Sequence, residues 1–259
     1  MPEGDTIHYA ANRIRGALAG RTPDDIATPH ARHGRDRWPE RLGGRGVTAV
    51  DAHGKHLFIR FEGDLVLHSH LRMTGKWKVH ETGTRWGRAA RRAWLVIHSD
   101  GHEVVQFDGP VLELMTSARA HNDPRIAHLG PDILAPDELD EKRILRLLRE
   151  DDQTRPIGDT LLDQRIVAGL GTIWRTEACY AARIDPHRPA SEVSNDEVLE
   201  ALRAVRPRMQ VSAVDGFRAA KRECYGLAGR PCGRCGTVMT CGTLGDNNRS
   251  AYWCPGCQG

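Results

Sequence analysis

Apolar residues recur at helical spacing near the start of the chain, and Asp5 stands where it can cap such a helix. The residues on the apolar face are Ile7, Ala10, Ile14 and Leu18. From residue 47 onward the pattern changes to short segments rich in β-branched and aromatic residues, separated by Gly- and Asp-containing turns. These segments are 47–52, 55–61, 64–70, 94–98 and 103–107. Several short strands joined by tight turns predict an antiparallel sandwich or barrel.

Helical spacing returns in the second half of the chain. We expect a helix capped by Asp137, a helical stretch near 160–168, a helix from Thr172, and another that opens with the capping box 194–197. The last 30 residues are rich in Cys and Gly. The predicted fold class is therefore α+β and multidomain, with boundaries at 1–135 (β-sandwich with an N-terminal helix), 136–228 (helical) and 229–259 (Cys-rich).

Charge is distributed unevenly, although the net charge is only +3. Residues 1–100 hold 17 basic and 11 acidic side chains, residues 101–199 hold 11 and 19, and residues 200–259 hold 9 and 4. Basic segments attract phosphate backbones, so the two basic ends permit a nucleic-acid partner, although they also fit an ordinary solvated surface. The longest apolar runs are a few residues, which excludes a membrane-spanning helix, and the first residues do not resemble a secretory signal. We expect a cytoplasmic protein, nucleoid-associated if bacterial, with reduced cysteines.

The Cys-rich tail carries the strongest local motif. Two CxxC pairs, Cys232/Cys235 and Cys254/Cys257, are separated by 18 residues, a length that fits a β-hairpin. Four thiolates suit tetrahedral zinc, and so short a segment with little apolar content needs a metal for stability. We therefore predict one structural zinc ion, with Cys241 as a non-ligand, and keep redox-active cysteines as the alternative.

The first residues are the chemical clue. Removal of Met1 before Pro2 would expose a secondary amine, and an α-amino group is partly neutral and nucleophilic at pH 7. Attack on an aldehyde-like carbon would give an iminium, and the adjacent Glu3 could transfer protons. Many chains begin with Met-Pro without such a role, so this feature alone decides nothing.

Several motifs occur together and in order, and the set resembles the formamidopyrimidine-DNA glycosylase/endonuclease VIII family of base-excision repair enzymes. The motifs are Met1-Pro2-Glu3-Gly4-Asp5, Gly54-Lys55-His56-Leu57, Leu129-Gly130-Pro131-Asp132, Asp163-Gln164-Arg165-Ile166-Val167-Ala168-Gly169-Leu170-Gly171 and the terminal CxxC pairs. The resemblance covers essentially the whole chain, and the Pro-Glu-Gly opening is similar to the endonuclease VIII branch. It implies an N-terminal β-sandwich, a helix–two-turn–helix domain and a four-cysteine zinc finger, with damaged DNA bound between domains.

The resemblance also implies catalytic roles. Pro2 matches the nucleophile that attacks C1′, and Glu3 matches the general acid/base. Lys55 matches the strand lysine that contacts phosphate and assists β-elimination. Arg249, with Asn248 beside it, matches the zinc-finger arginine that grips phosphates and is linked to δ-elimination. The product would be a one-nucleotide gap with phosphates at both ends.

A base inside a duplex is out of reach of an enzyme's nucleophile, so the damaged nucleotide must be flipped out. The family fills the vacated space from a strand loop, which here is the segment 70–75. Met73 is then the wedge, with Arg72 beside it, because apolar side chains inserted between base steps hold kinked DNA. The alternative for Met73 is a core residue.

Two glycines and the residue after them are expected at the DNA. Gly169 and Gly171 precede a helix N-terminus, which offers backbone N–H groups to a phosphate. Thr172 stands where the family usually has a phosphate-contacting asparagine, which leaves that contact weaker. Thr6 stands where an acidic residue is common, and segment 107–111 lacks the Arg and Phe that formamidopyrimidine enzymes insert opposite the damage. We therefore expect tolerance of the opposite base, extending to single-stranded or bubble DNA, and oxidised pyrimidines as preferred lesions.

The resulting hypothesis is a monomeric bifunctional DNA N-glycosylase and DNA-(apurinic or apyrimidinic site) lyase. Two alternatives stay open. One is a non-catalytic zinc-dependent DNA-damage-binding protein on the same fold, and retention of Pro2, Glu3 and Lys55 argues against it. The other is a zinc-ribbon RNA-binding protein with an unrelated N-terminal domain, which leaves Pro2, Glu3 and Lys55 unexplained.

Overall fold

The computed structural model of the protein describes residues 2–245 and 248–259. The chain divides into two compact units, one formed by Pro2 with Thr6–Ala127 and the other by Glu3–Asp5 with His128–Gly259. Helix α1 (Gly4–Leu18) therefore begins in the second unit and continues in the first. Each unit is described by itself below.

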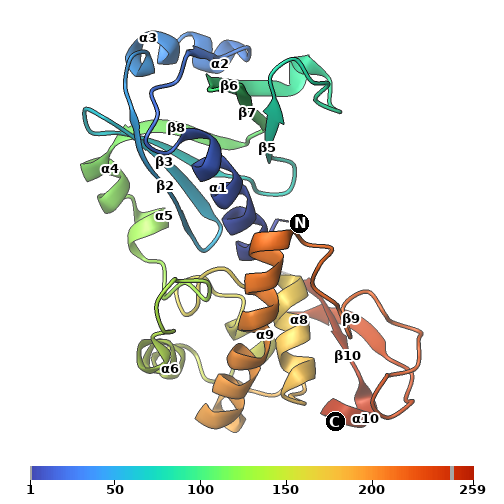
Figure 1. Ribbon diagram of the computed structural model, residues 1–259. Coiled ribbons are helices and arrows are strands. Elements are labelled where there is room, and N and C mark those ends of the chain that lie inside the picture. Colours follow the sequence, from blue (N-terminus) through green and yellow to red (C-terminus); the bar gives the residue numbers. More distant parts are fainter. Residues whose placement is uncertain (1, 246–247) are drawn as a thin grey trace. The chain divides into compact units, whose positions relative to one another are not determined.

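The first unit is an antiparallel β-sandwich (Figure 1). One sheet has the order β2-β3-β4-β8 and the other β1-β6-β7-β5, and every pairing is antiparallel. The strands are β1 (Asp25–Ala27), β2 (Val47–His53), β3 (His56–Phe61), β4 (Leu65–His70), β5 (Lys76–Glu81), β6 (Ala93–Ser99), β7 (His102–Phe107) and β8 (Val111–Thr116). Short helices α2 (Ala31–Gly34), α3 (Trp38–Leu42), α4 (Ser117–Asn122) and α5 (Pro124–Ala127) and the 3-10 turn Ala90–Arg92 complete it. This confirms the predicted antiparallel sandwich.

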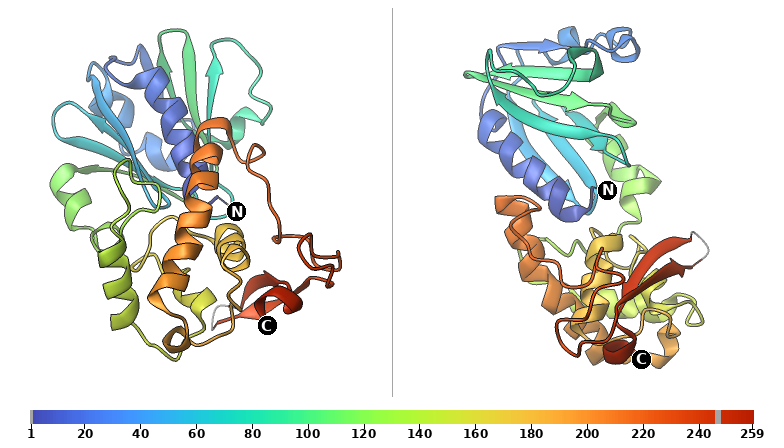
Figure 2. Two further views of the ribbon diagram at one scale, coloured as in Figure 1. Left: turned by 60° about the horizontal axis from the view of Figure 1, so that its bottom comes forward. Right: turned by 90° about the vertical axis from the view of Figure 1, so that its right-hand side faces the viewer.

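Helix α1 lies beside the sheets of the sandwich (Figure 2), and the core is formed by one face of α1 together with the inward-facing residues of both sheets. Strand β3 shows the principle, because Leu57, Ile59 and Phe61 enter this core, whereas Phe58 enters a smaller cluster with Val66 on the opposite face of the same sheet. The sheet β2-β3-β4-β8 is thus buried on both faces over part of its length.

Three strands of the sandwich were not predicted from the sequence, and all three lie at sheet edges. They are β1 and β5, at the two ends of one sheet, and β8, at one end of the other. Strand β5 alternates Trp77 and Val79 with charged or polar neighbours, which is how edge strands avoid pairing with other chains. An edge strand therefore carries a weaker apolar signal than the central strands that we predicted correctly.

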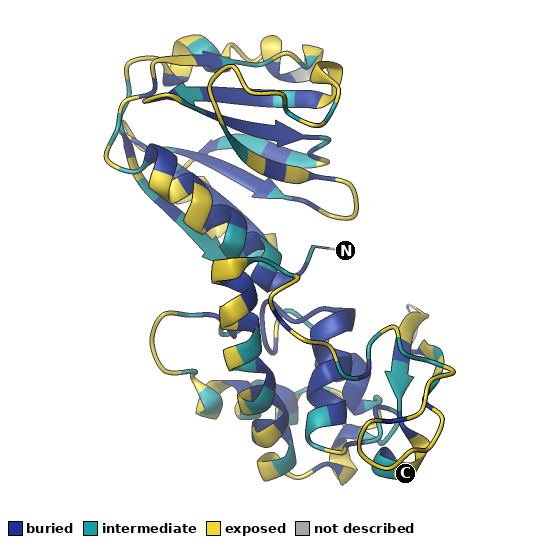
Figure 3. Cartoon of the chain, turned by 45° about the vertical axis from the view of Figure 1, so that its right-hand side comes forward, coloured by how far each residue is buried: buried dark blue, intermediate teal, exposed yellow. Residues whose placement is uncertain are grey.

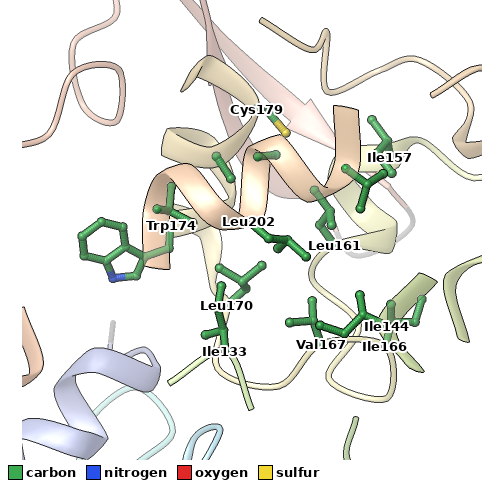
Figure 4. Close-up of a cluster of buried hydrophobic side chains, with 14 of the residues drawn as sticks. Ile133, Ile144, Ile157, Leu161, Ile166, Val167, Leu170, Trp174, Cys179 and Leu202 are labelled. Carbon is green, nitrogen blue, oxygen red and sulfur yellow. The ribbon is translucent and has the colours of Figure 1, made fainter. Parts of the chain in front are cut away.

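The second unit is built on helices around one apolar core, drawn in Figure 4. The helices are α6 (Glu141–Glu150), α7 (Ile157–Thr160), α8 (Thr172–Ala181) and α9 (Asn195–Asp215), with a 3-10 turn at Ala190–Glu192. Ser194 forms the expected capping box with Glu197 at the start of α9. Helix α6 is capped by Asp140, so the expected cap Asp137 was wrong by three residues.

The end of the chain is a β-hairpin of β9 (Thr240–Leu244) and β10 (Arg249–Trp253), followed by α10 (Pro255–Gln258). The hairpin lies between the two CxxC pairs, as their spacing predicted. Within residues 2–245 and 248–259, the structure has no helix with the length and apolar character needed to cross a membrane.

Candidate active site

Glu3 is held at the N-terminus of α8. Its side chain is buried, with 1% of its surface exposed. Oε1 accepts the Ile173 N–H at 2.8 Å, and Oε2 accepts the N–H groups of Gly171 at 3.1 Å and Trp174 at 3.2 Å. Gly171 caps α8 without a side chain of its own, so a carboxylate 168 residues away in sequence satisfies the orphan donors of this helix. These donors stabilise Glu3 as a carboxylate.

Glycines allow the segment that carries Glu3 to lie close to the first turn of α8. A Cβ on Gly171 would collide with the Glu3 carboxylate carbon, and a Cβ on Gly4 would lie 2.8 Å from Gly169 Cα. The Gly4 N–H donates to Gly169 O at 2.8 Å, and Gly169 has a φ of 103°, which favours glycine. The Pro-Glu-Gly and Gly-Leu-Gly motifs are therefore two halves of one contact.

Gln164 shapes the loop that carries these glycines. Its side-chain amide donates to Leu170 O at 2.9 Å and accepts the Gly169 N–H at 3.0 Å. Its backbone carbonyl accepts the Gly130 N–H at 2.9 Å, and a Cβ on Gly130 would lie 2.5 Å from Ile166 O. The motifs at 129–132 and 163–171 thus pack together and fix the position of α8's first turn.

The structure gives the α8 N-terminus a role that differs from the expected one. We expected Gly169, Gly171 and Thr172 to face a phosphate, but the Gly171 N–H belongs to Glu3 and the Thr172 side chain is 6% exposed. Beside them, buried Asp5 accepts a hydrogen bond from Ser212 Oγ of α9 at 2.5 Å. The phosphate contact of these three residues stays a prediction.

Lys55 lies in the tight turn between β2 and β3, next to a face lined with histidines. His56 Nδ1 is 2.8 Å from His68 Nε2, and the rings of His56 and His70 are 4.8 Å apart. Burial lowers the pKa of His56 to about 2 and that of His70 to about 4. Among the described residues, the only group of three or more side chains with metal-ligand spacing is the cysteine cluster, which includes neither His68 nor His70.

The expected wedge is a solvent-exposed loop after β4. Met73 is 66% exposed, which excludes the alternative of a core residue. Arg72 before it has a φ of 48°, and the Gly75 N–H donates to Leu71 O at 2.9 Å, closing the loop. Thr74 Oγ1 donates to Asp108 O at 3.4 Å and ties this loop to the one after β7.

Four cysteines of the two CxxC pairs converge. All four Sγ atoms lie within 4.8 Å of one another, in the set Cys232, Cys235, Cys254 and Cys257. Three of the Sγ–Sγ distances are 3.8, 3.5 and 3.3 Å. A tetrahedral ion with metal–sulfur bonds of about 2.3 Å would place sulfurs about 3.8 Å apart, so the cluster can hold one metal ion. Cys241 lies exposed on β9, outside this group.

Strand β10, which begins with Arg249, is tied to α8 by an unexpected residue. Arg175 is fully buried and donates to Gly158 O at 3.0 Å and to Ser250 O at 2.8 Å. It therefore fixes β10 immediately after Arg249. Asn248 has a φ of 47° at the start of that strand, whereas Asn247, also expected near the hairpin tip, lies outside the described residues, as does Met1.

Family models match both units. The N-terminal domain model of formamidopyrimidine-DNA glycosylase matches residues 1–111, and its H2TH (helix–two-turn–helix) domain model matches residues 129–219. The chain belongs to this family. A probable endonuclease 8 2 of Streptomyces coelicolor is 39% identical over 270 residues, covering 100% of this chain and 94% of that protein. A DNA-(apurinic or apyrimidinic site) lyase Nei2 of Mycolicibacterium smegmatis is 34% identical over 266 residues, covering 100% and 99%.

Solved structures support the same fold. Lactococcus lactis Fpg (MutM), crystallised with DNA containing N7-benzyl-Fapy-dG, has a TM-score of 0.83 at 23% identity, covering 99% of each chain. The resemblance to the formamidopyrimidine-DNA glycosylase/endonuclease VIII family is thereby confirmed, as are its endonuclease VIII branch and the predicted fold class.

Within this family fold, the structure brings some predicted site residues together. Glu3, Gly169, Gly171 and Thr172 meet at α8, and Arg249 and Asn248 share the hairpin with the cysteine cluster. Sequence reasoning missed Arg175. A signal was present, because Arg175 and Glu177 stand among apolar residues in α8, and charged side chains in such a setting need buried partners.

Proposed function

We propose that the chain is a bifunctional DNA glycosylase/AP lyase that removes oxidised bases in base-excision repair. The observation that carries the proposal is the Glu3 carboxylate, which three backbone N–H groups of α8 hold in place directly after Pro2 in sequence. Hydrogen bonds replace the water that this buried carboxylate loses, and a carboxylate fixed beside Pro2 in sequence supports a role in proton transfer.

In the proposed reaction, the Pro2 nitrogen attacks C1′ of the flipped nucleotide after removal of Met1. Attack displaces the damaged base, and the proton that the Pro2 nitrogen loses leaves with the base. The C1′–O4′ bond then opens as O4′ takes a proton from solvent, and the enzyme remains joined to the opened sugar as an iminium, which withdraws electrons from C2′. Glu3 is the proposed group that receives or returns a proton, and three backbone N–H groups hold its carboxylate in place.

The iminium allows two eliminations. Loss of a C2′ proton with cleavage of the C3′–O bond is the β-elimination, which we assign to assistance by Lys55. Loss of the C4′ proton with cleavage of the C5′–O bond is the δ-elimination, which we assign to Arg249 acting on the phosphates. Both bonds break to phosphate leaving groups, so a one-nucleotide gap remains with phosphates at its two ends.

The proposed DNA contacts rest on exposed side chains and on the family resemblance. Exposed Met73 is the proposed wedge in the vacated stack, with exposed Arg72 at its side and exposed Asn248 on the hairpin. Gly169, Gly171 and Thr172 are buried, and their part in the proposed interface rests on the resemblance alone. Segment 107–111 carries no Arg or Phe for the opposite strand beyond Phe107, which is buried. We infer a loose fit to the opposite base, oxidised pyrimidines as preferred lesions, and activity on bubble or single-stranded DNA.

Zinc is the proposed occupant of the four-cysteine cluster. Cys232, Cys235, Cys254 and Cys257 supply an all-thiolate set, which is typical of structural zinc. With no position open for water, the ion would stabilise the hairpin that carries Arg249 and would take no part in bond breaking.

The test is strand cleavage of duplexes that contain thymine glycol, 8-oxoguanine or an abasic site, each against four opposite bases. We expect nicking with phosphate at both ends of the gap, and faster release of thymine glycol. Faster 8-oxoguanine release would overturn the lesion preference, and absence of nicking at an abasic site would overturn the lyase itself. A non-catalytic damage binder would hold all of these duplexes without cutting any of them.

A further inference from the structure

A row of buried and half-buried polar side chains crosses the outer face of the sheet β2-β3-β4-β8. His56 on β3 pairs in register with His70 on β4, and His68 pairs with Glu113 on β8. His68 is fully buried, with His56 Nδ1 at 2.8 Å on one side and Glu113 Oε2 at 3.6 Å on the other. The order across the sheet is therefore carboxylate, imidazole, imidazole.

The far end of this row is anchored outside the sheet. The Arg125 guanidinium donates hydrogen bonds to Glu113 Oε2 at 2.6 Å and to Glu113 Oε1 at 3.3 Å. It also donates to Asp123 Oδ2 at 2.5 Å. Arg125 lowers the pKa of Glu113, which keeps it a carboxylate. Glu113 therefore has no proton to donate. Its negative charge lies 3.6 Å from His68 Nδ1, beyond hydrogen-bond distance, and favours the tautomer with the proton on that nitrogen.

This arrangement determines which nitrogen carries the proton in each imidazole ring of the row. With its N–H on Nδ1, facing Glu113, a neutral His68 has an acceptor lone pair on Nε2. His56 must then donate from Nδ1, which leaves its own Nε2 without a proton. Both rings stay neutral near pH 7. Burial and the nearby positive groups strongly lower the pKa of His56, and burial lowers the pKa of His68.

The near end of the row adjoins Lys55. His56 follows Lys55 directly and pairs with His53 across the turn. The Lys55 and Arg72 charges help to lower the pKa of His70, so both cations act on this end of the sheet. A proton on His56 would add a third positive charge at the lysine that the proposed reaction needs against a phosphate, and like charges at such distances repel strongly inside a protein.

We propose that Glu113, His68 and His56 are positioning residues. Together they keep the His56 ring, next to Lys55, neutral and in one tautomer, so that Lys55 is held in place for the lyase step. The inference rests on the proposed function. Its structural half, the proton arrangement, stands independently of any activity.

The first test is the tautomer of each imidazole in the full chain, from nitrogen-15 NMR of histidine-labelled protein. We expect His56 to be protonated on Nδ1 alone from pH 8 to pH 5, and Glu113→Gln to abolish this preference. Protonation of His56 on Nε2, or on both nitrogens at pH 6, would overturn the proposal.

The second test is single-turnover lyase rate on abasic DNA, with affinity measured separately. Glu113→Gln leaves Arg125 paired with Asp123, so the ion pair is not orphaned. We expect the rate to fall about tenfold with affinity for DNA nearly unchanged, because small misplacement of a reacting group costs rate. An unchanged rate in Glu113→Gln would refute the functional half.

Variants at His68 separate positioning from folding. His68→Leu can neither donate nor accept and should lower the rate at least as far, whereas His68→Gln can do both and should restore most of it. His98→Gln is the matched control, because His98 Nδ1 lies 3.8 Å from Glu103 Oε1 in the other sheet. The proposal is wrong if His68→Gln folds like wild type but does not restore the lyase rate. It is also wrong if His98→Gln lowers the lyase rate as much as His68→Leu does. A wild-type protein inactive on abasic DNA would instead refute the proposed function.

Discussion

The two units bury polar groups in opposite ways. The first buries neutral groups, since its most enclosed polar side chains include His56, His68 and Gln106. The second buries ionisable groups and surrounds them with fixed partners. Helix α8 is an example, because every residue from Thr172 to Tyr180 is buried, Arg175 and Glu177 included (Figure 3 colours the chain by burial). Glu3 meets three backbone N–H groups there, and four thiols converge at the hairpin.

Glu177 on α8 follows the same rule as Glu3. It is fully buried and accepts N–H groups from Glu223, Cys224 and Tyr225 at 2.9, 3.0 and 2.9 Å, with Arg208 at 2.8 Å. The contrast indicates that the stability of the first unit depends on its buried histidines staying neutral. The stability of the second unit depends on hydrogen-bond and ion-pair partners for its buried charged groups. The units should therefore fail under different conditions.

Loss of the metal should produce the largest effect, confined to the second unit. Chelation, or Cys254→Ser, removes the main stabiliser of the hairpin, because structural zinc contributes on the order of 10 kcal/mol to such small folds. We expect strand cleavage to fall at least about 100-fold and protease cuts to appear within 226–259, while the sandwich remains folded. Unchanged strand cleavage by the metal-free protein would contradict the conclusion that the second unit depends on its bound metal.

Gly171→Ala should have the next largest effect, since its Cβ would displace the Glu3 carboxylate. A buried carboxylate moved off its donors loses several hydrogen bonds, and we expect lyase activity to fall about 100-fold. Gly16→Ala is the matched control, because a Cβ there meets nothing within 4 Å and α1 should become slightly more stable. Equal activity in the two variants would contradict the assignment of Glu3.

Mild acid should act on the first unit before the second. The pKa of His56 falls from 6.5 to about 2 on folding, so the unfolded chain binds a proton that the folded chain rejects, and stability decreases as pH falls below 6.5. At pH 5 this amounts to about 2 kcal/mol for His56.

The second unit should resist acid longer. Arg188 lowers the pKa of Glu197 from 4.5 to about 2, so the stability that this carboxylate contributes is lost only as pH falls below 4.5. Thermal unfolding between pH 7 and pH 4, followed in wild type and His56→Gln, should show a flatter pH dependence in the variant between pH 6.5 and 5. A steeper one would contradict the neutral-histidine account.

Cys241→Ser should have the smallest effect. Cys241 is exposed on β9 and stands outside the metal-ligand group. Metal content, measured by elemental analysis, should stay at one ion per chain, with cleavage within about twofold of wild type. Loss of the ion would show that the thiol set is wrongly assigned.

The sequence predicted those features that depend on neighbouring residues. The face of α1, the central strands, the capping box at Ser194 and the CxxC hairpin all follow from local spacing. Contacts between distant segments did not follow. Nothing in the local pattern joins Glu3 to Gly171, because sterics of a backbone approach decide that contact.

The histidine row shows the same limit. His68 and His70 were visible as a pair on one strand, but the partnership of His68 with His56 and Glu113 depends on the register of three strands. Register is set by the whole sheet and its turns, so spacing along the chain could not reveal it.

The central claim is that the Pro2 nitrogen forms the covalent intermediate. The most direct measurement is borohydride reduction on abasic DNA, followed by proteolysis and mass spectrometry of the adduct. The account predicts a chain without Met1, with the sugar remnant on the Pro2 nitrogen. An adduct on a lysine side chain, or active protein that retains Met1, would contradict it.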